Sequence, residues 1–362
     1  MIESFLMTLQ PLEPYFFGNE KTFSFAQKTP ADSRYFIKSD RMPSQTTLLG
    51  TLRYAMMPVK NASFRYNKQD LVRNGYIIGE ESFQMDKEKQ SFGAIERLSP
   101  VFLMYNGKSY IRTPFDHAVK DKSGNHNTAY TPFREYTPVS TDQEKAWITR
   151  EYSAKDGLTD SFMELKSGEI IPCKDIFGNC TRVGVNKNQD AKAFFKKQYS
   201  MLSPGWMFAA YVHVDISRVE SDLEAAFAFD AMKAGSVVYM GQGKSAFMLR
   251  LTQQNDMLKT QVSAHLHPNA VYCMSDTLTS ASVSKDCLFA AVALHDHRDY
   301  STTFHSENGK LHGRIAKREM LYRLISGGSV FIAEDPRALR DQLADPHVEK
   351  VGLNFCVLNK ED

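Results

Sequence analysis

Two sequence patterns place imidazole groups, in one case with a carboxylate between them, where they could hold a metal ion. His295-Asp296-His297 is one pattern, and the pair His265 and His267 is the other. Such groups bind Zn²⁺ and related ions in metallohydrolases, and two histidines two residues apart on a strand project to the same face. No third ligand set accompanies either pattern, and Arg298 beside the first one opposes a cation. We therefore interpret the histidine patterns as polar surface residues at a strand end and keep a metal-dependent hydrolase as an alternative.

The segment at residues 240–245, Met-Gly-Gln-Gly-Lys-Ser, carries groups that could bind a phosphate. Its Gly-Lys-Ser end resembles a nucleotide-binding P-loop. However, Val238 occupies a position that a P-loop gives to glycine, and strands are predicted on both sides of the turn, whereas a P-loop opens a helix. The pattern excludes ATP or GTP binding. It predicts a tight turn whose main-chain amides, with Lys244 and Ser245, suit a phosphate of an RNA backbone. A plain hairpin turn is the competing interpretation.

Basic and aromatic residues are interleaved in two regions. The first, at residues 180–197, contains Arg182 and Lys187 together with Phe194, and the second surrounds Tyr322. This combination suits single-stranded RNA, because unpaired bases need a ring to stack on and phosphates need positive charge. A solvated helix face is the competing interpretation of such charge runs.

Two other histidines could serve a different RNA chemistry. His213 or His305, with Lys244, could supply the acid–base and cationic groups of a metal-independent ribonuclease. Neither histidine has a recognisable partner in the sequence. We therefore favour RNA binding without catalysis and keep a ribonuclease as an alternative.

The composition is that of an ordinary folded protein, with 42% apolar, 12% aromatic and 24% charged residues. The formal net charge is only +2, so any nucleic-acid site must be a local basic patch. No basic leader, signal peptide or membrane-length apolar stretch is present. The five cysteines are scattered, which favours reduced thiols over disulfides or zinc. These features predict a soluble cytoplasmic protein.

Strand and helix signals interleave along the chain. Residues 5–9 and 206–216 alternate as strands do, and Ser44 opens a helix that Pro58 ends. A second helix is expected at 221–232, two strands around the glycine turn, a helix opened by Asp335-Pro336, and a last strand at 351–358. Residues 60–200 are harder to interpret and predict insertions that reach a partner. The fold class is α+β, with an N-terminal domain at 1–216 and a C-terminal domain at 217–362.

Several stretches resemble one family. Residues 9–18, Leu-Gln-Pro-Leu-Glu-Pro-Tyr-Phe-Phe-Gly, are similar to the segment in which the first strand of the family ends. Residues 43–53, Pro-Ser-Gln-Thr-Thr-Leu-Leu-Gly-Thr-Leu-Arg, are similar to its first helix. Residues 182–185 and the glycine turn at 241–245 resemble two later signatures. The family is the RAMP superfamily (repeat-associated mysterious proteins), and the branch is the third subunit of the Cmr complex, the type III-B CRISPR effector.

The resemblance implies two ferredoxin-like (RRM-like) domains with long insertions, no cofactor and no catalytic residues. It implies that the chain binds the 5′ handle of the CRISPR RNA in antiviral defence. The partners implied are the large polymerase-like subunit and the backbone subunits, with target RNA contacted indirectly and no membrane. A hairpin insertion typically lies against the guide RNA in this family, and residues 170–187 are the candidate.

Residue roles follow as expectations. The N-terminus of the first helix should bind handle phosphates, because free amides and the helix dipole attract anions there. Arg53, nine residues beyond Ser44, is expected to make a packing or partner contact. The predicted RNA-binding residues are Arg41, Ser44, Gln45, Thr46, Arg182, Lys187, Gly241, Gly243, Lys244 and Ser245.

Overall fold

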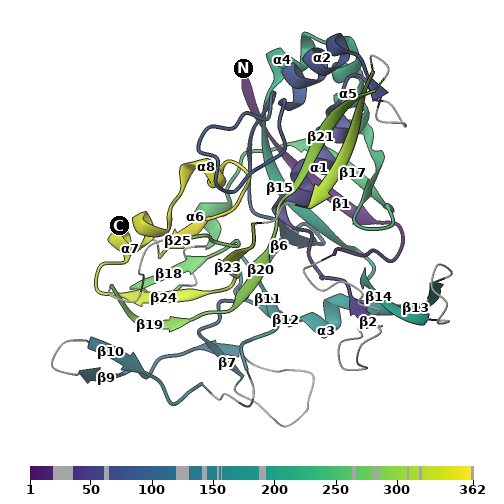
Figure 1. Cartoon of the computed structure of the whole chain (residues 1–362). Coiled ribbons are helices and arrows are strands. Elements are labelled where there is room, and N and C mark those ends of the chain that lie inside the picture. The colour runs from purple at the N-terminus through teal and green to yellow at the C-terminus, as the bar shows by residue number, and fades with distance from the viewer. Residues whose placement is uncertain are drawn as a thin grey trace. The chain divides into compact units, whose positions relative to one another are not determined.

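The computed structural model in Figure 1 describes residues 1–18, 36–60, 65–119, 130–140, 145–152, 155, 157–186, 193–262, 266–279, 283, 286–307, 310–317 and 320–359. The chain forms two compact units of three segments each. Unit 1 comprises Met1–Val101, Lys174–Asn255 and His297–Leu321, and unit 2 comprises Phe102–Cys173, Asp256–Asp296 and Tyr322–Asp362. Residue 216, where the sequence places a domain boundary, lies inside unit 1. None of the described helices is both long enough and apolar enough to cross a membrane.

The centre of unit 1 is an antiparallel sheet in the order β16-β17-β1-β15-β4. Its strands are β1 (Ile2–Pro11), β4 (Ile95–Leu98), β15 (Trp206–Asp215), β16 (Ser236–Met240) and β17 (Ser245–Gln253). Met7 and Leu9 of β1 are fully buried, and their cross-strand partners Leu251 and Leu249 on β17 point to the same core face. The alternation that predicts a strand at 5–9 is thus the pattern of one buried face.

Helices cover this face of the sheet. They are α1 (Gln45–Met56), which contacts β16 and α5, α4 (Ile216–Glu220), which contacts β1, and α5 (Leu223–Ala234), which contacts β17. α2 (Lys68–Ile78) packs on α1 and α4. Phe229 of α5 packs edge to face against Phe5, with ring centres 5.2 Å apart. The predicted cap of α1 is confirmed, because the Ser44 hydroxyl accepts a hydrogen bond from the Thr47 amide. α5 begins at Asp222 and ends at Gly235, whose φ of +115° favours glycine.

Two smaller sheets complete unit 1. β13 (Phe177–Asn186) and β14 (Ala193–Leu202) form a long hairpin, and β2 (Phe36–Lys38) runs parallel to β14. β21 (Tyr300–Glu307), β22 (Lys310–Lys317) and β3 (Arg65–Tyr66) form the other sheet. The expected hairpin at 170–187 is therefore shifted. Residues 170–172 form a strand of unit 2, α3 (Cys173–Ile176) follows, and the hairpin extends to Leu202 because β14 pairs along the whole of β13.

Unit 2 contains two four-stranded arrangements. The first has the order β12-β11-β6-β5, from β5 (Phe102–Tyr105), β6 (Lys108–Arg112), β11 (Ser161–Glu164) and β12 (Ile170–Pro172). The second has the order β19-β24-β18-β25, from β18 (Ala270–Cys273), β19 (Cys287–Ala291), β24 (Val330–Ala333) and β25 (Cys356–Leu358). Leu339 and Leu343 of α7 (Pro336–Leu343) pack on this second sheet against Val271 and Phe331.

Short elements account for the other described secondary structure. They are β7 (His117–Val119), β8 (Tyr130–Pro132), β9 (Thr137–Ser140), β10 (Lys145–Ile148), β20 (Leu294–His297), β23 (Tyr322–Ile325), α6 (Leu258–Val262) and α8 (Pro346–Glu349). The α+β class and the helix opened by Asp335-Pro336 are confirmed. The last strand was predicted too long. It begins at Cys356 because Gly352 (φ +81°) and Asn354 (φ +49°) turn the backbone before it.

Candidate nucleic-acid interface

Residues 14–17 of unit 1 are the centre of a main-chain hydrogen-bond network. Tyr15 exchanges two hydrogen bonds of 2.9 Å with Ser200 of β14. The Gln242 amide donates to the Phe16 carbonyl, and the Asp40 amide donates to the Phe17 carbonyl, each at 2.9 Å. The segment therefore joins three parts of the chain that are far apart in sequence: the β13–β14 hairpin, the glycine turn and the residues that precede α1.

Aromatic packing fixes this segment. The Tyr15 ring lies 4.8 Å from that of Phe17 and 5.7 Å from that of Phe247, centre to centre. Its hydroxyl donates a hydrogen bond to the Arg41 carbonyl at 2.9 Å. Burial raises the pKa of Tyr15 far above its usual value, so the phenol stays protonated and keeps this bond. The backbone that carries Arg41 is thus attached to the core.

The glycine turn between β16 and β17 approaches the same segment closely. Gly241 has φ +73°, and a Cβ atom added there would lie 2.4 Å from the Phe16 carbonyl oxygen, so only glycine fits. Gly243 (φ +98°) and Lys244 (φ +54°) are also left-handed, but a Cβ at Gly243 would meet nothing within 4 Å. Both residues are exposed. The strand-turn-strand context predicted for this turn is confirmed, and its tip presents backbone and one lysine to solvent.

Ser245, unlike Gly243 and Lys244, does not face solvent. Its side chain is buried, and its hydroxyl donates to the Pro14 carbonyl at 3.2 Å. We therefore assign Ser245 a structural role in holding the turn against residues 14–17, in place of the predicted RNA contact.

A row of cations and rings runs along one face of the β13–β14 hairpin. Arg182 and Lys197 are directly opposite each other in the antiparallel register. The Arg182 guanidinium lies 4.6 Å from the Tyr199 ring centre, and the Lys197 ammonium lies 4.0 Å from that of Phe16. The Lys197 ammonium also donates to the Gln242 side-chain oxygen at 3.0 Å, which connects the row to the glycine turn. These contacts are cation–π interactions at a partly desolvated site.

Electrostatics make this row suited to an anion. Burial lowers the pKa of Lys197 below its ordinary value, so the ammonium has lost part of its hydration. Within the described part of the chain, no carboxylate forms an ion pair with Arg182, Lys197 or Lys244. A phosphate placed here would meet cations that are not already neutralised. An unpaired base could meet the partly exposed Tyr199 ring, whereas the buried Phe16 ring only supports Lys197.

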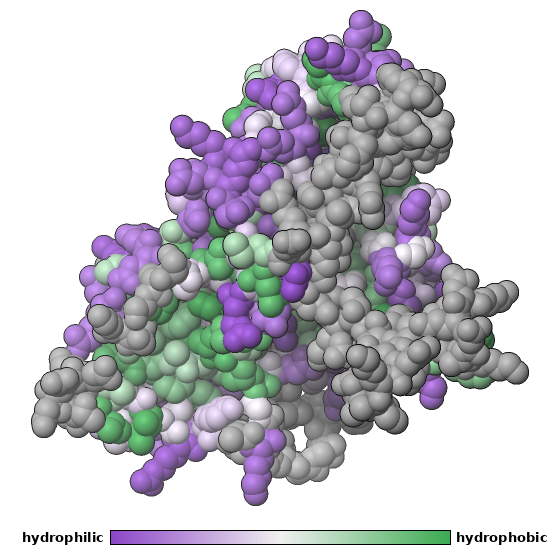
Figure 2. Space-filling model, in the orientation of Figure 1, coloured by the Kyte–Doolittle hydropathy of each residue, from purple (hydrophilic) through white to green (hydrophobic). Residues whose placement is uncertain are grey.

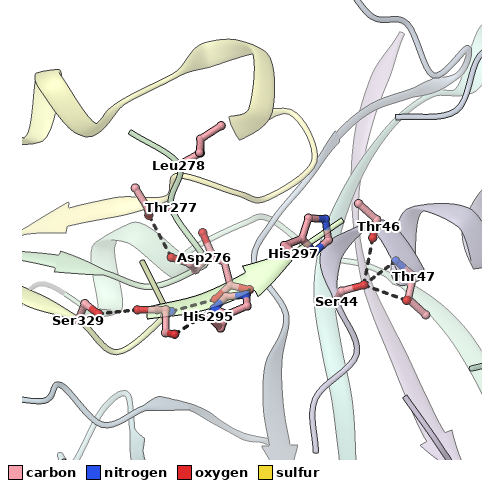
Figure 3. A network of polar contacts seen from close by, with 12 residues as sticks. Ser44, Thr46, Thr47, Asp276, Thr277, Leu278, His295, His297 and Ser329 are labelled. Carbon is pink, nitrogen blue, oxygen red and sulfur yellow. Dashed lines mark hydrogen bonds and ion pairs between the residues drawn. The ribbon is translucent and has the colours of Figure 1, made fainter. Parts of the chain in front are cut away.

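The N-terminus of α1 lies three residues after Arg41. The Ser44 hydroxyl is shared with the hydroxyls of Thr46 at 3.0 Å and Thr47 at 2.9 Å (Figure 3). Arg41 is exposed, with its guanidinium 5.8 Å from the Phe177 ring centre. Because α1 has no acidic residue in its first turn, its positive end is not offset locally.

Two polar residues of this helix have structural roles. Gln45 is buried; its amide nitrogen donates to the Ser99 carbonyl at 2.8 Å, and its amide oxygen accepts from the Val101 amide at 3.0 Å. Both ends of the side chain are therefore used inside unit 1, so a predicted RNA contact at Gln45 would have to come from its main-chain amide. Arg53 donates to the carbonyls of Ile78 and Gly79 at the end of α2. Of the two roles expected for Arg53, packing is the one observed.

The structure thus brings together part of the predicted set. Arg41, Arg182 and Lys244 are connected through residues 14–17, and Lys187 lies outside the described residues. Lys197 belongs to the basic and aromatic region expected at residues 180–197 but was not singled out among the RNA-binding residues. Tyr199, and Phe16 beneath Lys197, were not expected there. The alternation of Phe195, Lys197 and Tyr199 along a basic strand was the signal that could have identified Lys197 and Tyr199.

The histidine patterns do not form a three-ligand metal site. His295 lies with its Nε2 3.4 Å from an Asp276 oxygen (Figure 3). His297 has a different partner, because its Nε2 lies 3.2 Å from an Asp299 oxygen. His265 lies outside the described residues. Across the residues that the structure describes, no three His, Cys, Asp or Glu side chains gather in a way that could hold a metal ion.

His213 and Lys244, which the ribonuclease alternative would combine, lie far apart. His213 is opposite Ser4 in the β1–β15 register, whereas Pro11 at the other end of β1 is opposite Phe247, just after the glycine turn. Seven residues of strand separate these ends by about 23 Å. His213 and Lys244 therefore cannot act on one phosphate. For His305 the structure describes only the backbone, which pairs with His312 in the β21–β22 hairpin.

Comparison with known proteins finds one family whose sequence model covers the motifs described above. The chain belongs to the family described as CRISPR-associated protein (Cas_Cmr3), whose model matches residues 7–278. The match includes residues 14–17, α1, the β13–β14 hairpin and the glycine turn. The predicted family is confirmed, and membership supports a role in a type III CRISPR effector complex.

Two solved structures align with most of the chain at low sequence identity. A chain of the cryo-EM structure of the type III-B Cmr-beta bound to cognate target RNA is 13% identical, covers 98% of this chain and 96% of its own length, and has a TM-score of 0.47. A chain of the crystal structure of the Csm3-Csm4 subcomplex in the type III-A CRISPR-Cas interference complex is 10% identical, with coverages of 91% and 92% and a TM-score of 0.39. No curated protein matches the chain in sequence.

Proposed function

We propose that the chain is a non-catalytic subunit of a type III-B CRISPR effector complex that binds the 5′ handle of the CRISPR RNA. In this role it bridges the large polymerase-like subunit and the backbone subunits. The observation that carries the proposal is the network at residues 14–17, which gathers Arg41, the Arg182–Lys197 row and the glycine turn into one interface.

The chemistry of this interface favours single-stranded RNA. Phosphates are recognised by cations and main-chain amides, and unpaired bases by rings. Lys197 lies over the buried Phe16 ring and Arg182 over the partly exposed Tyr199 ring. A phosphate can therefore be bound by the two cations, and an adjacent base by Tyr199. Since Gly241 can approach the Phe16 carbonyl, the lysine that follows the turn is held beside this row.

Two ferredoxin-like folds are part of the proposal. If β1, β4, β15 and β17 are numbered in chain order, their sheet order is 4-1-3-2, with α1 after the first strand and α5 before the last. β18, β19, β24 and β25 follow the same order, with α7 before the last strand. This is the strand order of the βαββαβ ferredoxin-like unit. The order supports one such fold in each compact unit.

The non-catalytic role is supported by geometry at the interface. General acid–base catalysis needs a titratable group within hydrogen-bond reach of the reacting proton. Tyr15, the phenol of this network, is buried and donates to the Arg41 carbonyl, and Asp40 takes part through its main-chain amide. Among the described residues, no histidine takes part in the hydrogen bonds of residues 14–17. Incubation of the purified chain with repeat RNA should leave the RNA intact, and specific cleavage would contradict this part of the proposal.

A salt titration tests the RNA interface. Handle-RNA binding by the assembled complex would be measured by filter binding for Arg182→Ala, Lys197→Ala and Lys244→Ala, with the exposed Lys350→Ala of unit 2 as the control. Each phosphate contact to a single strand contributes about 0.7 to the slope of log K against log salt concentration. We expect each of the three variants to lose about that slope and the control to keep it. Three unchanged slopes would refute the assignment.

A further inference from the structure

Four large apolar side chains are exposed on two helices of unit 1. Val72 and Tyr76, four residues apart on α2, are 64% and 54% exposed. Leu223 and Phe227, four residues apart on α5, are 86% and 75% exposed. Residues four apart lie on the same side of a helix. We call these four residues the helical patch.

Polar contacts join the two helices beside the patch. The Arg73 guanidinium of α2 donates to both carboxylate oxygens of Asp222, the residue that caps α5, with one bond of 2.9 Å. Arg218 of α4 lies 5.3 Å from the Tyr76 ring centre. The two pairs of apolar side chains therefore belong to one surface at the end of unit 1 that carries α2, α4 and α5 (Figure 1). Figure 2 shows hydrophobic surface among hydrophilic residues there.

The patch is not needed for folding of α5. The helix already packs on the sheet through Ala225, Phe229 and Met232, which are buried on its opposite side. Leu223 and Phe227 add an apolar stripe on the side that faces solvent, so the helix is apolar on both sides. Helices of this kind are covered by another structure in the native assembly, and clustered exposed apolar residues mark interaction sites.

Charges around the patch define what covers it. Arg73 is paired with Asp222, and Arg218 with the Gly93 carbonyl and Asp215. Asp230 of α5 is paired with Lys233, whereas Glu220 of α4 and Glu224 of α5 are exposed. Lys68, four residues before Val72 on α2, is exposed as well. With Arg73 and Arg218 engaged, the remaining exposed charges are two carboxylates and one lysine, and this acidic excess favours a protein with a basic rim over RNA phosphates and anionic lipids.

We infer that the helical patch is the docking surface for another protein subunit, which presents apolar side chains ringed by lysine or arginine. The inference rests on the proposed function only in placing that subunit in the same effector complex. In this arrangement unit 1 has two separate surfaces, one basic and aromatic for RNA and one apolar with an acidic rim for protein.

Photo-crosslinking identifies the occupant. Phe227 would be replaced by the photoreactive p-benzoylphenylalanine in the reconstituted complex, and Leu294, which is 58% exposed on β20, would carry the same group as a control. Mass spectrometry of the product should show a crosslink from position 227 to a different protein subunit, through a site next to basic residues. A crosslink to RNA, to a second copy of this chain, or to nothing would overturn the inference.

A charge variant measures the contribution of the patch. Leu223→Glu/Phe227→Glu places like charges against the acidic rim and removes two anchors of the kind that dominate interfaces. We expect at least about 30-fold more of the variant to be needed for half-maximal incorporation into the complex, equivalent to about 2 kcal/mol. Leu294→Glu should incorporate as the wild type does, and circular dichroism checks that both variants are folded.

The two proposals fail in distinguishable ways. One outcome is that the charge variant is incorporated less, while the complex that does form keeps the wild-type salt slope of RNA binding. That result would support a protein surface separate from the RNA interface. Incorporation at the wild-type concentration would overturn the docking surface and leave the RNA interface standing.

Discussion

Replacement of Gly241 by alanine tests how the RNA interface is assembled. At φ +73°, an alanine is about 1–2 kcal/mol less stable than in ordinary conformations. In addition, its Cβ would lie 2.4 Å from the Phe16 carbonyl oxygen, a backbone atom that cannot rotate away. The turn and residues 14–17 must separate, which also endangers the hydrogen bond from the Gln242 amide to Phe16. That bond contributes about 1 kcal/mol. We expect a total loss of about 2–4 kcal/mol in the free energy of unfolding of unit 1.

Gly243→Ala is the matched control. Its φ of +98° carries a conformational cost, but a Cβ there meets nothing within 4 Å. Urea unfolding of the purified chain would compare the two variants, and Gly241→Ala should be the less stable by at least about 1 kcal/mol. RNA affinity of the complex should fall for Gly241→Ala, because Lys244 and Lys197 are displaced from each other. Equal stability of the two variants would refute the close approach between the turn and residues 14–17.

Three further outcomes follow from single residues. Gln45→Ala leaves the Ser99 carbonyl and the Val101 amide without partners in the core, so it should destabilise the chain by about 2–3 kcal/mol in urea unfolding and leave the RNA salt slope unchanged. Burial lowers the pKa of Lys197, so RNA affinity should begin to fall with rising pH earlier than for an ordinary lysine, and Lys197→Ala should lack this early decline in filter binding from pH 7 to 10. Asn354→Ala removes three buried hydrogen bonds and places alanine at φ +49°, so it should lower stability by about 3 kcal/mol or more, measured by thermal unfolding.

The pH prediction has a definite sign. A lysine with a lowered pKa in the folded chain loses its proton at a pH where an unfolded chain would keep it. Between the two pKa values the unfolded chain binds more protons, so the contribution of Lys197 to stability rises with pH. RNA binding has the opposite sign, because the phosphate needs the protonated ammonium. An RNA affinity that falls equally in the wild type and in Lys197→Ala would remove Lys197 from the interface.

Local sequence signals determined several elements. Ser44, Asp222 and Asp335 cap the helices that follow them, because a side-chain oxygen three residues or fewer away can satisfy a free amide without help from tertiary structure. The alternation in β1 and β15 likewise fixed which side chains face the core. The family motifs could also be recognised in the sequence, because glycines and prolines at fixed positions restrict the backbone conformation there.

Tertiary structure decided which of these residues face a ligand. Gln45 was expected at an open helix N-terminus, but bonds to residues more than fifty positions away bury it. Lys197 became an interface residue only because β14 places it over Phe16, which enters from the start of the chain. The helical patch could not be predicted from the sequence either, because the exposure of each residue of α5 depends on which side of the helix packs against the sheet.

The sequence by itself therefore determined the class of fold, the starts of helices α1 and α7 and the family, all of which depend on short-range backbone chemistry and side-chain periodicity. Only the tertiary structure decided that residues 14–17 gather the basic residues into one interface and that Gln45 and Ser245 are structural. These outcomes depend on pairing between segments far apart in the sequence, such as Tyr15 with Ser200, Phe16 with Gln242 and Gln45 with Ser99, and no local pattern encodes such pairs.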